Sequence, residues 1–333
     1  MEQTQLKIRA TDPDGTTANI TEACRSITWS GDYRNAARTL SYSPIVCQDD
    51  IHLPRAPTEL GGEVQFWRDS ELLMDAFALE LTRDSLGITI YVTAYDRGLY
   101  LTRNSTFLRV EGRTAEAVTA SLCGQFGIQA GTLAATGVTI TRNFLGVSLY
   151  KIIMTMYTLA SDQTGKKYRI RFRGAKLEVV EMAQSEESVI LVPGSNLLSC
   201  VTKESASAMT NSVAIYDDGF NLVSTRQDDS AVALYGLMQT AIRSGAYDDP
   251  EGHARQVLAE NGLKTTITVN ALGDLRLITG NTVVVKEPVT GIQGLCWIIS
   301  DTHTWTRNLY QTKLTLSLEA LMDSQTAGSE AKK

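Results

Sequence analysis

The chain has 333 residues, enough for two or three domains, and a compact protein of this length buries roughly three-quarters of its unfolded surface without needing disulfides. Hydrophobic residues make up 43% and charged residues 20% of the sequence, a composition that excludes a largely disordered protein. The net charge of −6 argues against a general nucleic-acid-binding protein, which would carry a basic excess.

The cysteines indicate reduced, mostly buried thiols in a cytosolic protein. They are odd in number, widely spaced and without a C-x-x-C pair, so no disulfide framework is expected. No apolar run follows the first residues and no stretch approaches 18 apolar residues, so we expect neither a signal peptide nor a membrane span. The five cysteines are Cys24, Cys47, Cys123, Cys200 and Cys296.

Residues 1–105 are expected to form a first domain made of β-strands. The Asp-Pro-Asp-Gly sequence at 12–15 is a strong turn signal between strands at 6–9 and 18–21. The segment 88–95 alternates apolar with polar or aromatic residues, which predicts a strand with one face on a core and one tyrosine-bearing face toward solvent or a partner.

Residues 106–188 are expected to form a small α/β domain. Helices are predicted over 115–125 and 149–160, and each follows a Thr or Ser that can accept a hydrogen bond from the first turn. The alternating segment 167–181, with a Gly-Ala turn at its centre, predicts a hairpin. The two capping residues are Thr114 and Ser148.

Residues 189–322 are expected to form a second β domain that repeats the layout of the first: strand, loop, strand, spacer, hairpin, strand. The spacer of the second copy is long, and residues 227–263 predict a helical insertion. Residues 323–333 are polar and are expected to form a flexible tail. The matched segments are 26–30, 38–42, 62–67, 73–79 and 88–95 in the first copy, and 198–202, 211–216, 280–285, 296–300 and 314–318 in the second.

No catalytic, cofactor-binding or metal-binding residue is predicted. The three histidines, His52, His253 and His303, have neither the mutual spacing nor the nearby cysteines of a metal site, so satisfied surface or loop histidines are expected. No nucleophile motif or phosphate-binding glycine loop is present. Four Asp-Asp pairs could serve a glycosidase, but they border turns, where capping roles fit better; they lie at 49–50, 217–218, 228–229 and 248–249.

A basic segment at 166–173 places Arg169, Arg171 and Arg173 on one strand face. A strand that binds single-stranded nucleic acid combines charge with stacking aromatics on the same face. Here the aromatic residues lie on the opposite face, which favours a solvated or protein-facing strand.

The aromatic residues supply the candidate interface. The four tryptophans lie in or beside β segments, where core packing is the default interpretation, but Trp and Tyr are also enriched at interface centres. Trp67 ends a strand next to charged residues, and two tyrosines share the outer face of the 88–95 strand. The predicted interface residues are Phe66, Trp67, Tyr91 and Tyr95.

Four blocks of sequence resemble a known family. They are ITWSGDYRNAARTL (27–40), VTAYDRGLY (92–100), AATGV (134–138) and GVSLYKIIM (146–154). In order and spacing they resemble the XkdQ/YqbQ-like proteins of defective prophages, which are similar to the late control D-like hub at the centre of a contractile-tail baseplate. The resemblance covers residues from about 5 to 322.

The resemblance implies an α+β, mainly β fold, with two tube-type β-barrel-like domains flanking the small α/β domain. It implies a homotrimeric ring of pseudo-six-fold symmetry that joins the hexameric inner tube to the trimeric spike of a phage tail or phage-tail-like bacteriocin. It offers no catalytic residues and no cofactor, so we expect a structural protein and not an enzyme.

Further implied partners are baseplate wedge and LysM-type tail proteins, with the tape measure and DNA as candidate occupants of the lumen and no specific nucleic-acid binding. Assembly in the bacterial cytoplasm and release by lysis are expected. Two alternatives stay open. A tail-associated peptidoglycan hydrolase needs an acid–base pair or a metal site, and a carbohydrate-binding adaptor needs exposed aromatic residues in loops.

Overall fold

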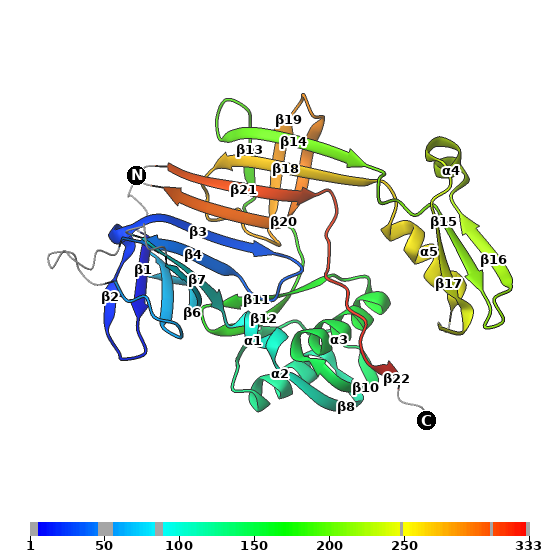
Figure 1. Ribbon diagram of the computed structural model, residues 1–333, viewed down its shortest axis with the longest axis horizontal. Coiled ribbons are helices and arrows are strands. Elements are labelled where there is room, and N and C mark those ends of the chain that lie inside the picture. The colour runs from blue at the N-terminus through cyan, green and yellow to red at the C-terminus, as the bar shows by residue number, and fades with distance from the viewer. Residues whose placement is uncertain (1–5, 46–55, 84–88, 247–248, 307–308, 331–333) are drawn as a thin grey trace. The chain divides into compact units, whose positions relative to one another are not determined.

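The computed structural model describes residues 6–45, 56–83, 89–246, 249–306 and 309–330 (Figure 1). The chain divides into two compact units, a larger one of residues 1–199 and 269–333 and a smaller one of residues 200–268. Strands predominate, helices are few, and the fold is α+β, as expected.

The first β module begins with a hairpin at the predicted Asp-Pro-Asp-Gly turn. Its strands run in the order β3-β4-β7-β6-β5-β1-β2 within a large, mainly antiparallel sheet. They are β1 (Leu6–Thr11), β2 (Thr17–Asn19), β3 (Cys24–Asp32), β4 (Thr39–Pro44), β5 (Glu63–Arg68), β6 (Glu71–Arg83) and β7 (Ile90–Asp96), with a 3-10 turn η1 (Thr21–Ala23) before β3.

The core of this module follows from the alternation of its strands. In β7, Ile90, Val92 and Ala94 are buried, whereas Tyr91 is 57% exposed. The rings of Trp29 and Phe66 meet edge to face inside the core, with centroids 5.8 Å apart. The amphipathic pattern therefore fixes which side of the sheet is covered.

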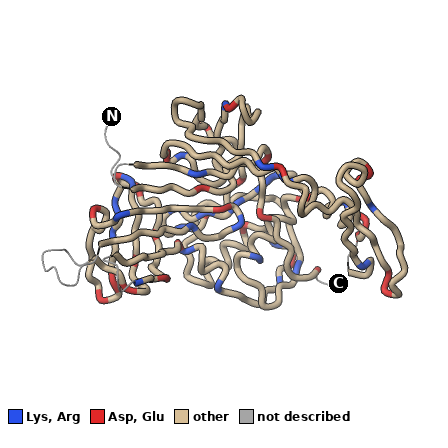
Figure 2. The backbone as a smooth tube through the Cα atoms, turned by 45° about the horizontal axis from the view of Figure 1, so that its top comes forward, with Lys and Arg blue, Asp and Glu red and all other residues tan. Residues whose placement is uncertain are grey.

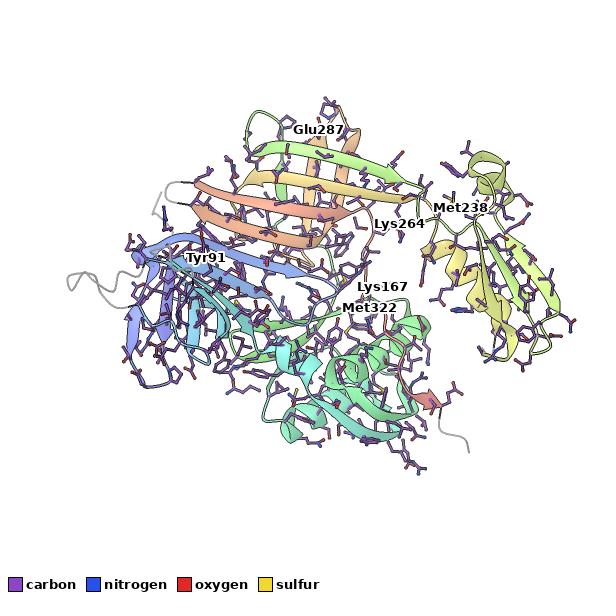
Figure 3. The ribbon with its side chains drawn as sticks, viewed as in Figure 1. Tyr91, Lys167, Met238, Lys264, Glu287 and Met322 are labelled. Atoms are coloured by element: carbon purple, nitrogen blue, oxygen red, sulfur yellow. The ribbon has the colours of Figure 1, made fainter. Side chains whose placement is uncertain are left out.

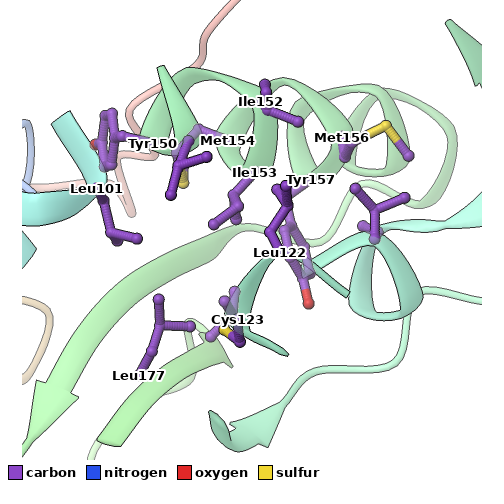
Figure 4. Close-up of a cluster of buried hydrophobic side chains, with 14 of the residues drawn as sticks. Leu101, Leu122, Cys123, Tyr150, Ile152, Ile153, Met154, Met156, Tyr157 and Leu177 are labelled. Atoms are coloured by element: carbon purple, nitrogen blue, oxygen red, sulfur yellow. The ribbon is translucent and has the colours of Figure 1, made fainter. Parts of the chain in front are cut away.

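The α/β domain packs its helices over two small sheets, β22-β10-β8 and β11-β12-β9, of which β22 (Ser329–Glu330) comes from the C-terminal segment. The cluster in Figure 4 gathers side chains from several of these elements, and the Tyr157 hydroxyl at its edge donates to the Ala134 carbonyl at 3.0 Å. The elements are α1 (Gly98–Arg103), β8 (Ser105–Thr114), α2 (Ala115–Gln125), β9 (Gln129–Leu133), β10 (Thr139–Ser148), α3 (Leu149–Thr164), β11 (Tyr168–Arg173) and β12 (Lys176–Glu181).

Both predicted helix caps are confirmed. The Thr114 hydroxyl accepts from the Ala117 amide, and the Ser148 hydroxyl accepts from the Lys151 amide. Helix α3 runs past the predicted end at 160 because the left-handed Gly165, with φ of 73°, supplies the stop. The hairpin β11–β12 forms with its turn where the alternation predicted it.

The second β module joins the first through the long strand β20. Part of β20 pairs with β19 and β21, and residues 300–306 pair antiparallel with β3, which places His303 opposite Trp29. One sheet therefore runs through both modules. The strands are β13 (Val189–Leu191), β14 (Leu197–Ser205), β18 (Lys264–Leu272), β19 (Thr282–Glu287), β20 (Ile292–Thr306) and β21 (Leu309–Ser317).

The smaller unit corrects the expected repeat. The strand predicted at 211–216 forms, but it is the centre of a separate sheet, β16-β15-β17, and among the described strands it pairs with none of the large sheet. Its residues 212–215 are all buried, as in a strand covered by a helix and not in a half-exposed one. The unit comprises β15 (Ser212–Tyr216), β16 (Leu222–Gln227), α4 (Asp229–Tyr235), β17 (Gln239–Arg243), η2 (Ser244–Ala246) and α5 (Pro250–Glu260).

The insertion is therefore larger than the predicted 227–263. The core of the unit is formed by Val213 and Ile215 of β15 and Ala254 of α5. Helix α5 begins at an Asp249 cap with Pro250 in its first turn. Strand β15 thus belongs to the inserted unit, and the correspondence between 38–42 and 211–216 is wrong.

The expectation of a flexible tail is also wrong for residues 323–330. The Tyr150 hydroxyl donates to Asp323 at 2.6 Å, and the Gln325 amide donates to the Thr158 hydroxyl at 3.1 Å. Strand β22 (Ser329–Glu330) pairs with β10. Met322, labelled next to Lys167 in Figure 3, accepts from the Tyr168 amide through its sulfur. Polar side chains here make tertiary hydrogen bonds, which composition does not reveal.

Candidate functional site: a buried polar junction and an outward sheet face

The part of the chain that the structure describes has no cluster typical of a metal site. Within the described ranges no three His, Cys, Asp or Glu side chains come close enough to hold a metal ion. Among the same residues, no helix has the length and hydropathy to cross a membrane. Acidic and basic residues are interspersed along the chain (Figure 2).

One of the three histidines differs from the predicted surface or loop positions. His303 is fully buried, with Nδ1 2.8 Å from the Tyr310 hydroxyl and Nε2 3.1 Å from the Leu277 carbonyl. It is a satisfied core histidine. His253 lies in α5 of the smaller unit, and His52 lies outside the described residues.

Three of the acidic pairs contain residues with the predicted turn and cap roles. Asp217 accepts from the Asn221 amide in a turn, Asp228 caps α4, and Asp249 caps α5. The pair at 49–50 lies outside the described residues.

A buried ion pair holds the two β modules together. Arg38, immediately before β4, pairs with Asp301 of β20, whose side chain is fully buried. The backbone amide of Thr279 donates to Asp301 at 2.7 Å, and its hydroxyl does so at 2.6 Å. Burial alone would raise the pKa of Asp301, but the Arg38 guanidinium and the hydrogen bond from His303 hold it well below its usual range.

The residues around Arg38 give the first resemblance block a physical meaning. The Arg38 guanidinium lies over the Trp29 ring, 3.9 Å from its centroid. A Cβ at Gly31 would lie 2.3 Å from Arg38 Nη1, so only glycine leaves room for the guanidinium in this arrangement. The block thus encodes an arginine, the aromatic ring it covers and the glycine beside it.

The first two blocks meet at Asp96, which is fully buried. Its carboxylate accepts from the backbone amides of Arg38 at 3.1 Å and Gly98 at 2.8 Å. A Cβ at Gly98 would lie 2.1 Å from the Ala36 carbonyl oxygen. Burial raises the pKa of Asp96 to about 7, against the lowering effect of the two amides. The order and spacing of the blocks therefore reflect one packed junction.

The predicted interface residues divide between core and surface. Phe66 is fully buried beside Trp29, so its side chain is withdrawn from the interface hypothesis. Alternation places Trp67, Tyr91 and Tyr95 on the outward face of the same sheet. Tyr91 is labelled in Figure 3. The Tyr95 hydroxyl donates to Glu80 at 2.8 Å, and this hydrogen bond raises the pKa of Tyr95.

The basic strand β11 faces protein, one of the two alternatives expected for it. Arg169 donates to the Thr279 carbonyl, and Arg171 pairs with Glu178 at 2.7 Å. Arg173 is exposed and lies 3.7 Å from Glu71. The three arginines line one wall of a pocket of about 230 Å³.

The junction residues Thr279 and Asp301 were not identified from the sequence, and His303 was expected at the surface or in a loop. Asp301 and His303 occupy alternate, inward positions of β20. The available signal was polar residues at positions where the alternation expects apolar ones, because such residues are retained in a core only when they are paired.

Comparison with known proteins agrees with this fold. A sequence model of the YQBQ-like family matches residues 27–317. The uncharacterized protein YqbQ of Bacillus subtilis (strain 168) is 23% identical over 288 residues, covering 84% of this chain and 87% of YqbQ.

Two solved structures share the architecture along nearly the whole chain. The 43 kDa tail protein of prophage MuSo2 from Shewanella oneidensis superposes with a TM-score of 0.70 at 12% identity, covering 93% of this chain and 98% of that one. The tail protein from Neisseria meningitidis MC58 gives 0.66 at 14% identity, covering 96% and 99%. The resemblance inferred from the four blocks is confirmed, and the chain belongs to the YQBQ-like family.

Proposed function

We propose that the protein is the structural hub of a contractile phage tail or tail-like particle, a trimeric ring of pseudo-six-fold symmetry. The observation that carries the proposal is the antiparallel pairing of β3 with β20, which makes one sheet of two β modules in a single chain. Three such chains contribute six β modules. The tail-protein architecture supports the same assignment.

The proposed mechanism is symmetry adaptation. Closed cyclic symmetry keeps the assembly finite, and a permanent trimer would bury more than roughly 2,000 Å² in total. Six similar modules in a three-fold ring can contact a hexameric inner tube on one side and a trimeric spike on the other. The role requires no chemical step by the protein.

The partners that follow from this role are the inner tube protein, the central spike, and baseplate wedge and LysM-type tail proteins. The tape measure and DNA are the candidate occupants of the lumen. The particle would assemble in the bacterial cytoplasm and leave the cell by lysis. A complete phage, a defective prophage and a bacteriocin would all use such a hub.

The outward face that carries Trp67, Tyr91 and Tyr95 is the proposed contact between chains. Exposed aromatic side chains at such a site bury a large apolar area on association. The variant Tyr91→Arg should reduce the trimeric fraction measured by light scattering. Phe220→Arg is the matched control. Phe220 is 89% exposed, and it lies in the smaller unit, whose sheet is separate from the sheet that carries Tyr91. Equal effects of the two variants would refute the assignment of the contact.

The structural role is separated from the hydrolase and adaptor alternatives by two assays. Purified protein incubated with peptidoglycan should release no soluble fragments, and immobilised glycans should retain none of the protein. Fragment release that persists in freshly purified, protease-free material would replace the proposal with a hydrolase. Saturable glycan retention by a chain that does not assemble would replace it with an adaptor.

A further inference from the structure

A small charged pocket lies where the α/β domain meets the junction of the β modules. Its volume is about 230 Å³, below the roughly 300–1,000 Å³ of sites for drug-sized ligands and well above the ~30 Å³ of one water. The size suits one functional group with its hydration. The lining includes Trp29, Arg38, Arg169, Arg171, Arg173 and Thr279.

Three of the four arginines in this lining have a carboxylate partner. Arg38 pairs with Asp301, Arg171 with Glu178, and Arg173 lies near Glu71.

Arg169 differs from the others. Among the residues that the structure describes, its hydrogen-bond partner is the Thr279 carbonyl, and no carboxylate forms an ion pair with it. A guanidinium carries five N–H donors, so one carbonyl leaves most of them available.

The environment of Arg169 makes this missing counter-charge costly. Burial, followed by repulsion from Arg171 and Arg38, lowers the pKa of Arg169 to about 10, against the attraction of the nearby Asp301 and Glu178 carboxylates, and the group stays cationic at neutral pH. A partly buried cation without a paired anion is unfavourable and attracts one.

The backbone is shaped to hold the Arg169 guanidinium where it lies. A Cβ at Gly280 would lie 2.3 Å from Cζ, Nε and Nη1 of Arg169, so this glycine forms a cradle that any side chain would fill. Gly280 also has φ of 83°, a conformation that favours glycine. Gly280 therefore leaves room for the guanidinium, and its hydrogen bond to the Thr279 carbonyl holds it there.

Two further donors belong to lining residues. Within the described chain, Trp29 Nε1 and Arg38 Nε are buried and have no hydrogen-bond partner. Buried donors are normally satisfied, so each needs an acceptor.

The acidic residues of the lining are already engaged. Asp32 accepts from the Arg34 amide, Glu71 pairs with Arg68, and Asp96 accepts two backbone amides. The acidic residues of the lining therefore leave the Arg169 cation without an ion-pair partner.

We propose that this pocket binds one oxyanion, a carboxylate or a phosphate, on the guanidinium of Arg169. Two parallel N–H···O bonds from the guanidinium fork match either group. The oxyanion has two sources: a free anion from solution, or an acidic side chain of a neighbouring copy. The second source rests on the proposed ring, whereas the first does not.

The test titrates inorganic phosphate against chloride at constant ionic strength and follows thermal unfolding of the intact protein. If the source is a free anion, phosphate should raise the midpoint of the wild type by about 2–4 °C, since ligand that binds the folded state stabilises it. The Arg169→Met variant should lose this shift. Arg109→Met is the matched control, because Arg109 is exposed and pairs with Glu111 on β8.

If the source is a neighbouring copy, phosphate leaves the midpoint of the assembled particle unchanged. Arg169→Met then lowers the particle mass measured by light scattering, and Arg109→Met does not. A monomeric protein that shows the phosphate shift supports the site even where the ring proposal fails.

The proposal is overturned if Arg169→Met keeps both the phosphate response and the particle mass of the wild type. Circular dichroism checks that this variant is folded. If it is not, Arg169→Lys replaces it, because lysine retains the charge but not the fork. The lysine variant should bind phosphate at least several-fold more weakly, and unchanged affinity would equally overturn the proposal.

Discussion

Removing the Asp301 carboxylate should destabilise the larger unit more than any surface change. In Asp301→Ala, Arg38 loses its ion-pair partner, and the Thr279 amide and hydroxyl lose their shared acceptor. Arg38 is only 18% exposed, so water replaces the carboxylate poorly. Breaking a buried ion pair from one side costs about 3–5 kcal/mol.

The assay is urea unfolding followed by tryptophan fluorescence, because Trp29 lies against Arg38 and reports on this junction. The matched control is Asp218→Ala. Asp218 pairs with Arg243 at 3.4 Å on an exposed part of the smaller unit, and its loss should leave the transition unchanged.

The pH dependence of the same variant provides a second check. Folding lowers the pKa of Asp301. The stability that the ionised Asp301 gives to the folded state is therefore complete above the unfolded pKa of about 3.9, and it is lost as pH falls through the lower folded pKa. The difference in stability between wild type and Asp301→Ala should therefore shrink below about pH 4. A loss under about 1 kcal/mol at pH 7, or a difference that does not depend on pH, would refute the proposed role of the ion pair.

Three further predictions concern the packing around Asp96 and the anchoring of the C-terminal segment. Burial raises the folded pKa of Asp96 to about 7, so the contribution of Asp96 to folding stability is most favourable below about pH 4 and declines as pH rises through 7. In Asp96→Asn, the thermal midpoint measured against pH should no longer show this decline. Gly98→Ala, whose Cβ would meet the Ala36 carbonyl at 2.1 Å, should cost about 1–3 kcal/mol in urea unfolding, and a neutral result would contradict the close approach. A chain ending at residue 321 loses the Asp323 and Gln325 bonds and should lose about 1–3 kcal/mol by thermal circular dichroism, whereas an unchanged midpoint would contradict the anchored tail.

Local signals in the sequence predicted much of the fold. The alternation in β7 and β11, the caps Thr114 and Ser148, and the turn at 12–15 each act over a few residues, and the structure forms all of them. The four sequence blocks identified the family because they combine residues that must pack together. Gly31, for example, is explained only by the guanidinium beside it.

What escaped prediction depends on contacts between distant residues. Arg38 and Asp301 are far apart in sequence and meet because β3 pairs with β20. No local sequence pattern predicts this pairing. Strand β15 fitted the layout of a repeat, yet it has its own sheet partners in the inserted unit. Phe66 and Trp67 were predicted together for the interface, although adjacent residues of a strand face opposite sides.

The most direct test of the hub is imaging of purified protein by negative-stain electron microscopy, with its mass measured on the same peak by light scattering. The account predicts particles of three chains with a central hole and six peripheral densities in end-on averages, formed by the chain alone or on addition of the inner tube protein. A chain that stays monomeric and forms no ring when the tube protein is present would contradict it.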